Sequence, residues 1–400
     1  MNDPRVSPAT STAASEHLAR AQRVALPLAL ACLAILAAGA VASPARALTN
    51  LLVGAVLVLG LAVGGIVLLS LLAVANAGWA VVLKRILEGL GSFVPVGGVL
   101  LLATTPGLRV LYAWARPEAA RDALLVGKAA CLNPTFFVVR MVGILCVWML
   151  FGLRLRRLSL AQDAGGAGDA AALATRRTVR WAAGFLVVFA VTACLGAFDW
   201  IMTLEAHWFS TIFGFYNVAG ILVSTVTAVA IAAILLRRAG ALPELRDDHL
   251  HDLGKLMFAF ATFWAYQWVS QFLLIWYSNI PEETAYFEAR WRDGWMVVFF
   301  ANLIVNWALP FLLLLPRAVK RNERALLAIG ALLLLGRWLD LWLMTMPANF
   351  PERPVPGLFE LAGLVGPLSL LVFWLARTFA RVPLLARHDP YLGESLHHHI

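Results

Sequence analysis

The sequence predicts an all-α integral membrane protein with about ten transmembrane helices. Of its 400 residues, 61% are hydrophobic and only 14% are charged, and the mean hydropathy is +0.79. Apolar runs of about 20 residues, the length that crosses a bilayer, recur along the chain. The net charge of +9 arises from short basic clusters between these runs, a pattern typical of topology-setting loops and not of a nucleic-acid-binding surface.

The first apolar run, 24–42, follows a polar N-terminus (1–23) that we expect to be mobile. The sequence Ala-Val-Ala-Ser-Pro at 40–44 resembles a signal-peptidase site, so cleavage is the alternative to a retained helix. The other predicted spans are 51–75, 93–114, 131–153, 181–198, 212–236, 256–280, 295–315, 325–346 and 358–379. A tail, 381–400, follows the last span.

Three segments between or within the spans have their own patterns. Residues 78–88 form a short amphipathic piece that we expect to lie along the membrane interface. Pro95 and Pro106 interrupt the third span. Residues 154–180 are predicted to form the longest basic loop, with a flexible linker at 163–168.

Ten spans place both ends of the chain on one side of the membrane. Most of the 32 Lys and Arg residues fall in the loops of that side, so the positive-inside rule predicts cytoplasmic termini. The loop after the fifth span contains no Lys or Arg, and it is therefore predicted to face outward.

Polar residues gather in and around this outward loop. Asp199, Glu205 and His207 lie there among tryptophans and phenylalanines, which fits either a functional face or a turn anchored by interfacial aromatics. Polar residues within spans are costly and suggest function; here they are Arg140, Gln271, Tyr277, Asn302, Arg337 and Asp340. We expect these groups to line one outward-opening polar region. The alternative is a set of ion pairs that fixes helix packing, Arg337 with Asp340 and Arg140 with Asp199.

A second polar group precedes the seventh span on the predicted cytoplasmic side. His249, His251, Asp252 and Lys255 could form a proton entry, since carboxylates and histidines relay protons. In the alternative interpretation, Asp248 or Asp252 caps the helix and the remainder is a solvated loop.

Redox-centre ligands are not expected in this chain. The four cysteines have no Cys-x-x-Cys spacing, and the eight histidines fall outside the apolar cores. A haem held between membrane helices needs histidines within the spans, and an iron-sulfur cluster needs clustered cysteines. We therefore expect no haem, iron-sulfur cluster or metal to be bound by this chain.

Three stretches carry a family resemblance: FDWIMTLEAHWFSTIFG at 198–214, HLHDLGK at 249–255 and SQFLLIWYSNIPEET at 270–284. Further matches lie at 80–88, 128–140 and 337–340. Together they resemble a membrane subunit of bacterial alternative complex III, a quinol:cytochrome c oxidoreductase, over roughly residues 50–400. Ala206 and Asn133-Pro134 depart from the family pattern.

The resemblance implies ten transmembrane helices with two four-helix bundles, at about 51–200 and 210–346, related to polysulfide-reductase-type membrane anchors. It implies a bacterial inner-membrane location and a complex in which menaquinol or ubiquinol is oxidised near the outer face. Iron-sulfur, c-type haem and sister quinone-site membrane subunits would be the partners.

Quinol oxidation needs a proton acceptor, an aromatic slot for the ring and a nearby electron acceptor. Asp199, Glu205 and His207 are candidate proton acceptors, which Arg140, Arg337 and Asp340 would tune. Trp208, Gln271 and Tyr277 are candidate quinone contacts, and the electron acceptor belongs to a partner. Two other functions fit the same sequence: a stand-alone secondary transporter or proton channel, and a purely structural anchor for peripheral electron-transfer subunits.

Overall fold

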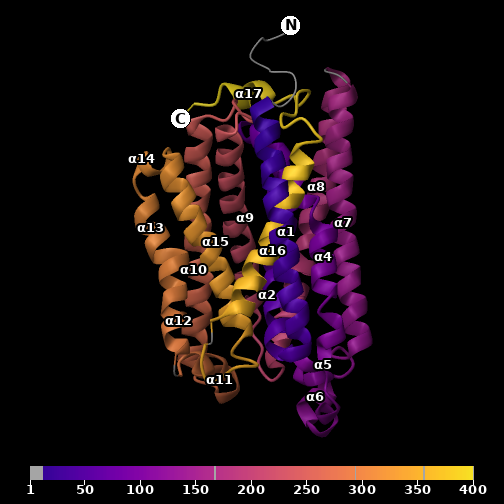
Figure 1. The fold of residues 1–400 in the computed structure, drawn as a ribbon, viewed down its shortest axis with the longest axis vertical. Coiled ribbons are helices and arrows are strands. Elements are labelled where there is room, and N and C mark those ends of the chain that lie inside the picture. Colours follow the sequence, from indigo (N-terminus) through magenta and orange to yellow (C-terminus); the bar gives the residue numbers. More distant parts are fainter. Residues whose placement is uncertain (1–11, 166–167, 293, 355, 400) are drawn as a thin grey trace.

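The chain forms one bundle of long helices that stand side by side in Figure 1. The computed structural model describes residues 12–165, 168–292, 294–354 and 356–399, and over these residues all regular structure is helical. Nine of the described helices are long and apolar enough to cross a membrane. The chain is therefore an all-α, multi-pass integral membrane protein, as predicted.

A tenth long helix, α10 (Asp247–Ser278), has 32 residues and runs beside the others in Figure 1. It is less apolar because Tyr266, Gln267 and Gln271 interrupt its hydrophobic sequence. At the rise of an α-helix it extends about 48 Å, which exceeds the ~30 Å thickness of a bilayer's hydrocarbon core. The described part of the chain thus contains about ten spans.

Predicted and observed bounds agree best for spans bordered by short turns. α16 (Leu358–Phe379) has the predicted bounds, and α9 (Ile212–Arg238) begins where predicted. α2 (Pro44–Val74) begins seven residues early because Pro44 starts the helix directly after Ser43.

The predicted loop 154–180 is mostly helical. α7 (Pro134–Gly165) and α8 (Asp169–Trp200) continue well beyond their apolar parts. The linker prediction at 163–168 is wrong for 163–165, which belong to α7, and 166–167 lie outside the described residues. The prediction treated the end of the apolar run as the end of the helix, but Ala, Leu and Arg are strong helix formers in water as well.

The N-terminal segment 1–23, predicted to be mobile, also differs from the prediction. Residues 12–23 belong to α1 (Thr12–Ala42) and are helical, whereas residues 1–11 lie outside the described part. The polar residues of this segment therefore extend a spanning helix.

The third span runs from Gly78 to Leu111 and not over 93–114. It is broken into five pieces: η1 (Gly78–Leu83), α3 (Lys84–Gly91), α4 (Val94–Leu102), η2 (Thr105–Gly107) and α5 (Leu108–Leu111). Pro95 lies in the first turn of α4 and Pro106 in η2, positions where the missing N–H breaks no helical hydrogen bond. The interfacial placement of 78–88 is wrong, because Arg85 and Glu88 are each only 4% exposed. This piece is the buried beginning of the span.

The remaining elements are η3 (Ala113–Ala115), η4 (Pro117–Arg121), α6 (Ala123–Lys128), η5 (Met202–Glu205), α11 (Pro281–Arg290), α12 (Trp295–Leu303), the π turn η6 (Ile304–Ala308), α13 (Leu309–Leu314), α14 (Arg317–Lys320), α15 (Glu323–Thr345) and α17 (Leu392–Leu396).

The spans pack as two groups. α2, α3–α4, α7 and α8 form the first group, α9, α10, α12–α13 and α15 form the second, and α1 packs with α16 against α2. α2 is central, with 83% of its most apolar segment buried against 28% for α1. A Cβ on Gly54 of α2 would lie 2.1 Å from the Gly363 carbonyl oxygen of α16. Glycine therefore allows the close backbone approach that holds membrane helices together.

The two ends of the bundle differ. Figure 1 shows the start of α1 and α17 at one end and α6 and α11 at the other. We call these the α17 end and the α11 end. The distribution of Lys and Arg predicts that the α17 end is cytoplasmic and that the α11 end faces outward.

Candidate functional site

Arg337 and Asp340 form a buried ion pair within α15. Arg337 Nη1 lies 2.6 Å from Asp340 Oδ2, because residues three apart share one face of a helix. Asp340 is fully buried and Arg337 is 3% exposed. Two charges this deeply buried need further hydrogen bonds to compensate for lost hydration.

Three neighbouring helices supply those hydrogen bonds. Tyr216 of α9 donates its hydroxyl to Asp340 Oδ1, and Trp264 of α10 donates Nε1–H to Asp340 Oδ2 at 3.2 Å. Asn302 of α12 donates to Oδ1 at 3.1 Å. Every helix of the second group therefore contributes to one site. We call it the Asp340 centre, and it comprises Tyr216, Asn217, Trp264, Asn302, Arg337 and Asp340.

A glycine makes room for the arginine of this centre. Arg337 Nη2 donates to Asn217 Oδ1 at 3.1 Å, passing Gly220 one turn along α9. A Cβ on Gly220 would lie 2.3 Å from Arg337 Nη1. Only glycine lets the guanidinium reach both Asn217 and Asp340.

The π turn η6 orients Asn302. Asn306 lies in this turn and donates to Asn302 Oδ1 at 2.7 Å and to the Gly336 carbonyl at 2.9 Å. The amide of Asn302 is therefore held with its Nδ2 toward Asp340. π turns inside longer helices often occur at functional sites.

A small cavity of about 20 Å³ adjoins the Asp340 centre. Its wall includes Asp340, Tyr216, Gln271, Phe287 and Arg290. Gln271 is buried, and its Nε2 has no hydrogen-bond partner among the described residues. A cavity of this size with polar walls holds a water molecule but not a larger ligand.

Arg290 borders this cavity near the α11 end. Its Nη2 lies 2.6 Å from Glu205 Oε1, and the guanidinium donates to the carbonyls of Leu343 and Met344 at 3.0 and 2.9 Å. It also donates to the carbonyl of Tyr286 at 2.8 Å. Arg290 thus satisfies the last carbonyls of α15 and fixes α11 against them, and it holds Glu205 beside the cavity.

An open groove of about 390 Å³ lies between the last turns of α10 and α11. We call it the aromatic groove; it is lined by Phe272, Ile275, Trp276, Asn279, Thr284, Phe287, Glu288, Trp291 and Arg292. Phe287 lines the small cavity as well, so its ring lies in the wall between the two spaces. The volume is within the range of small-molecule sites.

Arg140 and Asp199 form a bidentate pair in the first helix group. Arg140 Nε and Nη2 lie 2.7 and 2.9 Å from the two Asp199 oxygens, and the guanidinium covers the Phe136 ring at 4.4 Å. This geometry joins α7 to α8. Among the described residues, neither Arg140 nor Asp199 forms a hydrogen bond or ion pair with a member of the Asp340 centre.

His207 points to the surface. Its side chain is 61% exposed, and Nε2 lies 2.6 Å from Asp122 Oδ2. Asp122 also caps α6 by accepting from the N–H groups of Leu124 and Leu125. The hydrogen bond with His207, followed by those from the backbone, lowers the pKa of Asp122. The predicted single outward polar region is therefore wrong: Asp199, Glu205 and His207 have separate partners, and Glu205 alone adjoins the cavity through Arg290.

The three predicted quinone contacts, Trp208, Gln271 and Tyr277, do not lie in one site. Trp208 is buried, stacks on Tyr286 at 3.9 Å and donates to the Glu283 carbonyl at 3.1 Å, so it packs α11 against the bundle. Gln271 lines the small cavity. Tyr277 is 88% exposed on the outer surface of α10, and its grouping with Gln271 was wrong.

The predicted proton entry lies at the α17 end, and three of its four residues are buried: His249, His251 and Asp252. The side chain of the fourth, Lys255, is 50% exposed. His249 Nδ1 accepts from the Arg246 N–H at 3.0 Å, and Nε2–H donates to the Ser395 carbonyl at 3.1 Å. His249 therefore makes the cap contact that we had predicted for Asp248 or Asp252. Burial, with a further contribution from His398, lowers the pKa of His249 to about 4.

His251 and Asp252 are enclosed as well. Asp252 pairs with Lys255 and with His398, whose Nε2 is 2.7 Å away. His251 is buried with its Nδ1 unpartnered among the described residues, and burial lowers its pKa. The solvated-loop alternative is wrong for His249, His251 and Asp252, which are buried in the first turns of α10. The C-terminal residues cover His249 and Asp252.

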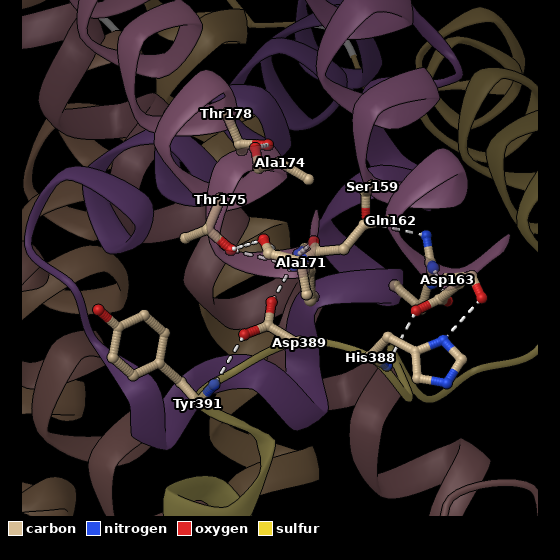
Figure 2. A network of polar contacts seen from close by, with 12 residues as sticks. Ser159, Gln162, Asp163, Ala171, Ala174, Thr175, Thr178, His388, Asp389 and Tyr391 are labelled. Atoms are coloured by element: carbon tan, nitrogen blue, oxygen red, sulfur yellow. Dashed lines mark hydrogen bonds and ion pairs between the residues drawn. The ribbon is translucent and has the colours of Figure 1, made fainter. Parts of the chain in front are cut away.

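Sequence reasoning missed a second ionic cluster, in the first helix group. Arg85 Nη1 lies 2.5 Å from Glu88 Oε2 and 3.1 Å from Ser159 Oγ, and Nη2 pairs with Asp163. Figure 2 shows Ser159 and Asp163 beside the chain's C-terminal residues. An Arg and a Glu three apart within an apolar stretch, the same spacing as Arg337 and Asp340, was the available signal.

A C-terminal strap, 388–399, joins this cluster to α10. His388 Nδ1 lies 2.7 Å from the Asp163 carbonyl, as Figure 2 shows, and Asp389 pairs with Lys84 at 2.7 Å. Ser395 Oγ donates to the Trp79 carbonyl at 2.7 Å. The strap therefore bridges the two helix groups at the α17 end.

Among the described residues, no group of three or more His, Cys, Asp and Glu side chains is placed to hold a metal ion. No protein-family model and no curated protein matches this chain. The fold and its sites define a multi-pass membrane protein with an ionic cluster inside each of its two four-helix groups.

Proposed function

We propose that this chain is a membrane subunit of a quinol-oxidising respiratory complex of the alternative complex III type, without a redox centre of its own. It would lie in the bacterial inner membrane with cytoplasmic termini, beside iron-sulfur, c-type haem and sister quinone-site membrane subunits. These partners would pass the electrons to cytochrome c or another acceptor. The observation that carries the proposal is the aromatic groove at the α11 end, separated by Phe287 from the cavity of the Asp340 centre.

The residues of the groove fit a quinone headgroup. Phe272, Trp276 and Trp291 offer flat apolar surfaces for the ring of menaquinol or ubiquinol, and Thr284, Glu288 and Arg292 offer hydrogen bonds at its rim. A bound quinol would supply the electrons and protons of the reaction. This chain would orient the ring and shield one side of it from water.

Two carboxylates have different roles in this proposal. Glu288 lies at the groove, is more than half exposed and pairs with Arg292 at 3.2 Å, so its carboxylate can accept a proton and release it to water. Asp340 already accepts four hydrogen bonds or ionic contacts. These contacts hold the carboxylate in place, so Asp340 fixes the wall behind Phe287.

The test is Trp291→Ala in the assembled complex, with Phe263→Ala as the control. Phe263 is an exposed aromatic residue of α10 outside the groove. We expect the KM for quinol to rise about tenfold with Trp291→Ala, the loss of one aromatic contact of roughly 1.4 kcal/mol, and to be unchanged in the control. An unchanged KM and kcat with full complex assembly would refute a quinol site here.

A stand-alone secondary transporter or proton channel is the second candidate, because a buried charged cluster within a span is typical of ion pathways. Purification under mild conditions separates the two. Co-purifying iron-sulfur and c-type haem absorbance would exclude the solitary transporter. An assembled complex whose turnover is unaffected by both Trp291→Ala and Asp340→Asn would instead favour the structural-anchor role.

A further inference from the structure

Five exposed or partly exposed arginines form a belt around α7 and α8 where these helices leave their apolar parts near the α17 end. We call them the arginine belt: Arg154, Arg157, Arg176, Arg177 and Arg180. Arg154 covers the ring of Trp181 at 5.4 Å, which fixes the register of the two antiparallel helices. The other four then fall within about two turns of this contact.

The belt has no acidic partner in the described part of the chain. Other arginines at this end are paired: Arg237 with Asp247 at 2.7 Å, Arg238 with Glu323 at 2.8 Å, and Arg85 with Glu88 and Asp163. None of the five belt residues takes part in an ion pair that the described residues form. Their positive charge is therefore available to an external partner.

The belt faces away from the bundle. The opposite faces of α7 and α8 point inward and carry buried residues: Leu155, Ser159 and Thr178. Arg157 and Arg177 lie on the outward faces of the two helices. The guanidinium groups thus lie on faces that are exposed in the described part of the chain.

An apolar surface continues the same outward faces toward the middle of the membrane. Leu150 and Leu153 of α7 are 56% and 38% exposed, and Val187 and Val191 of α8 are 71% and 60% exposed. Trp181 lies at the boundary between this surface and the belt, the level where tryptophans anchor helices in a bilayer. The combination of a cationic row above an exposed apolar face matches the two halves of a phospholipid.

We propose that the arginine belt binds an anionic phospholipid of the adjacent leaflet. Its phosphodiester group would lie among Arg157, Arg177 and Arg180, with the acyl chains along the apolar faces of α7 and α8. Arginine suits this role because its planar fork donates two hydrogen bonds to one phosphate. An acidic protein surface is less favoured as the partner, because the belt directly adjoins an exposed apolar face that acyl chains would cover.

The test compares two triple variants of the full chain purified in detergent. R157Q/R177Q/R180Q removes three belt charges and retains the contact of Arg154 with Trp181. R109Q/R121Q/R353Q removes three charges from exposed residues near the α11 end. Native mass spectrometry measures binding of cardiolipin and phosphatidylglycerol, with phosphatidylcholine as the neutral probe.

We expect wild type and the control to bind the two anionic lipids in preference to phosphatidylcholine. The belt variant should lose about tenfold or more in affinity for them, since each charge near an anionic headgroup contributes to attraction. Its affinity for phosphatidylcholine should not change. If the triple variant fails to fold, R177Q alone should lose a few-fold in affinity against R353Q.

Three results would overturn the proposal. The first is equal anionic-lipid binding by wild type and the belt variant. The second is an equal loss in the belt variant and the control, which would show a net-charge effect only. The third is unchanged lipid binding with loss of a co-purifying protein, which would assign the belt to a protein interface.

Discussion

Arg337 shows what a buried charge requires in this chain. It has an acid three residues away, an amide on a second helix and a glycine that leaves space for the guanidinium. Arg290 is similarly surrounded, by one carboxylate and three carbonyls. Because each buried guanidinium has several partners on different helices, loss of one contact affects the packing of several helices.

Gly220→Ala tests this dependence. The added Cβ would overlap Arg337 Nη1, so the guanidinium must move away from Asp340 or Asn217. We expect a loss of stability of about 1–3 kcal/mol. Thermal unfolding in detergent, followed by tryptophan fluorescence, measures it.

Gly143→Ala is the matched control for that substitution, because Gly143 is also helical but a Cβ there has no neighbour within 4 Å. Its Tm should stay the same or rise slightly. An equal Tm for both variants would contradict the spatial argument at Gly220.

At the residue scale, sequence reasoning named two of the ion pairs, Arg337 with Asp340 and Arg140 with Asp199. It missed Arg85 with Glu88 and Arg290 with Glu205. Arg337 and Asp340 share a helix face, so their spacing predicts the pair. Arg290 and Glu205 are 85 positions apart, and α11, which carries Arg290, was not predicted. Tyr277 was assigned to the wrong face because hydropathy alone does not fix the rotation of a polar-aromatic helix.

The start of α10 is an element whose stability should depend on pH. His249 in the folded protein has a pKa of about 4, well below its ordinary value of 6.5, because it is buried and lies beside His398. Below pH 6.5 the unfolded chain binds a proton that the folded chain does not. Stability should therefore fall as the pH decreases from 6.5 to 4, by roughly 3 kcal/mol at most.

His249→Gln removes this titration while an amide can still accept from Arg246 and donate to Ser395. We expect its Tm to fall less than that of wild type between pH 6.5 and 4.5. His207→Gln is the control, since His207 is exposed. If the Tm of His249→Gln decreased with pH as steeply as that of wild type, other groups, such as the buried His251, would be the cause of the lost stability.

Element bounds were predictable where composition changes sharply and not where a helix leaves the membrane. The bounds of α16 follow from an apolar run between prolines and glycines on one side and arginines on the other. α7 and α8 continue beyond their apolar runs because nothing in 154–162 or 169–180 breaks a helix. The glycine-rich segment 163–168 was predicted as a linker, but the helical segments on both sides, 154–162 and 169–180, were predicted as loop.

At the scale of the whole molecule, the C-terminal strap holds the two helix groups together at the α17 end. It contacts η1 and α3 through Ser395 and Asp389, and α10 through Ser395 and His398. The sequence gives no sign of this, because the segment is short, polar and terminal. Its contacts arise from backbone carbonyls and side chains that lie far apart in the chain.

Removing residues 388–400 should expose those contacts to water. We expect the Tm to fall and the amide protection of residues 78–84 and 246–252 to decrease about tenfold or more, since several partly buried hydrogen bonds are lost together. Hydrogen-exchange mass spectrometry in detergent measures this. His399→Ala, a substitution of an exposed side chain, is the control, and unchanged protection after truncation would refute the bridging role.

The π turn η6 also has a consequence for how this helix tolerates insertions and deletions. A π turn contains one residue more than the α-helical turn it replaces, so the two halves of α12–α13 are offset by about 100° from a continuous α-helix. Deleting one residue within 304–308 would restore the regular ladder but rotate Asn302 relative to Asn306 and Gly336. The hydrophobic pattern would survive such a deletion, whereas the donor to Asp340 would face another direction. Chain length in this one turn is therefore as important to the Asp340 centre as residue identity.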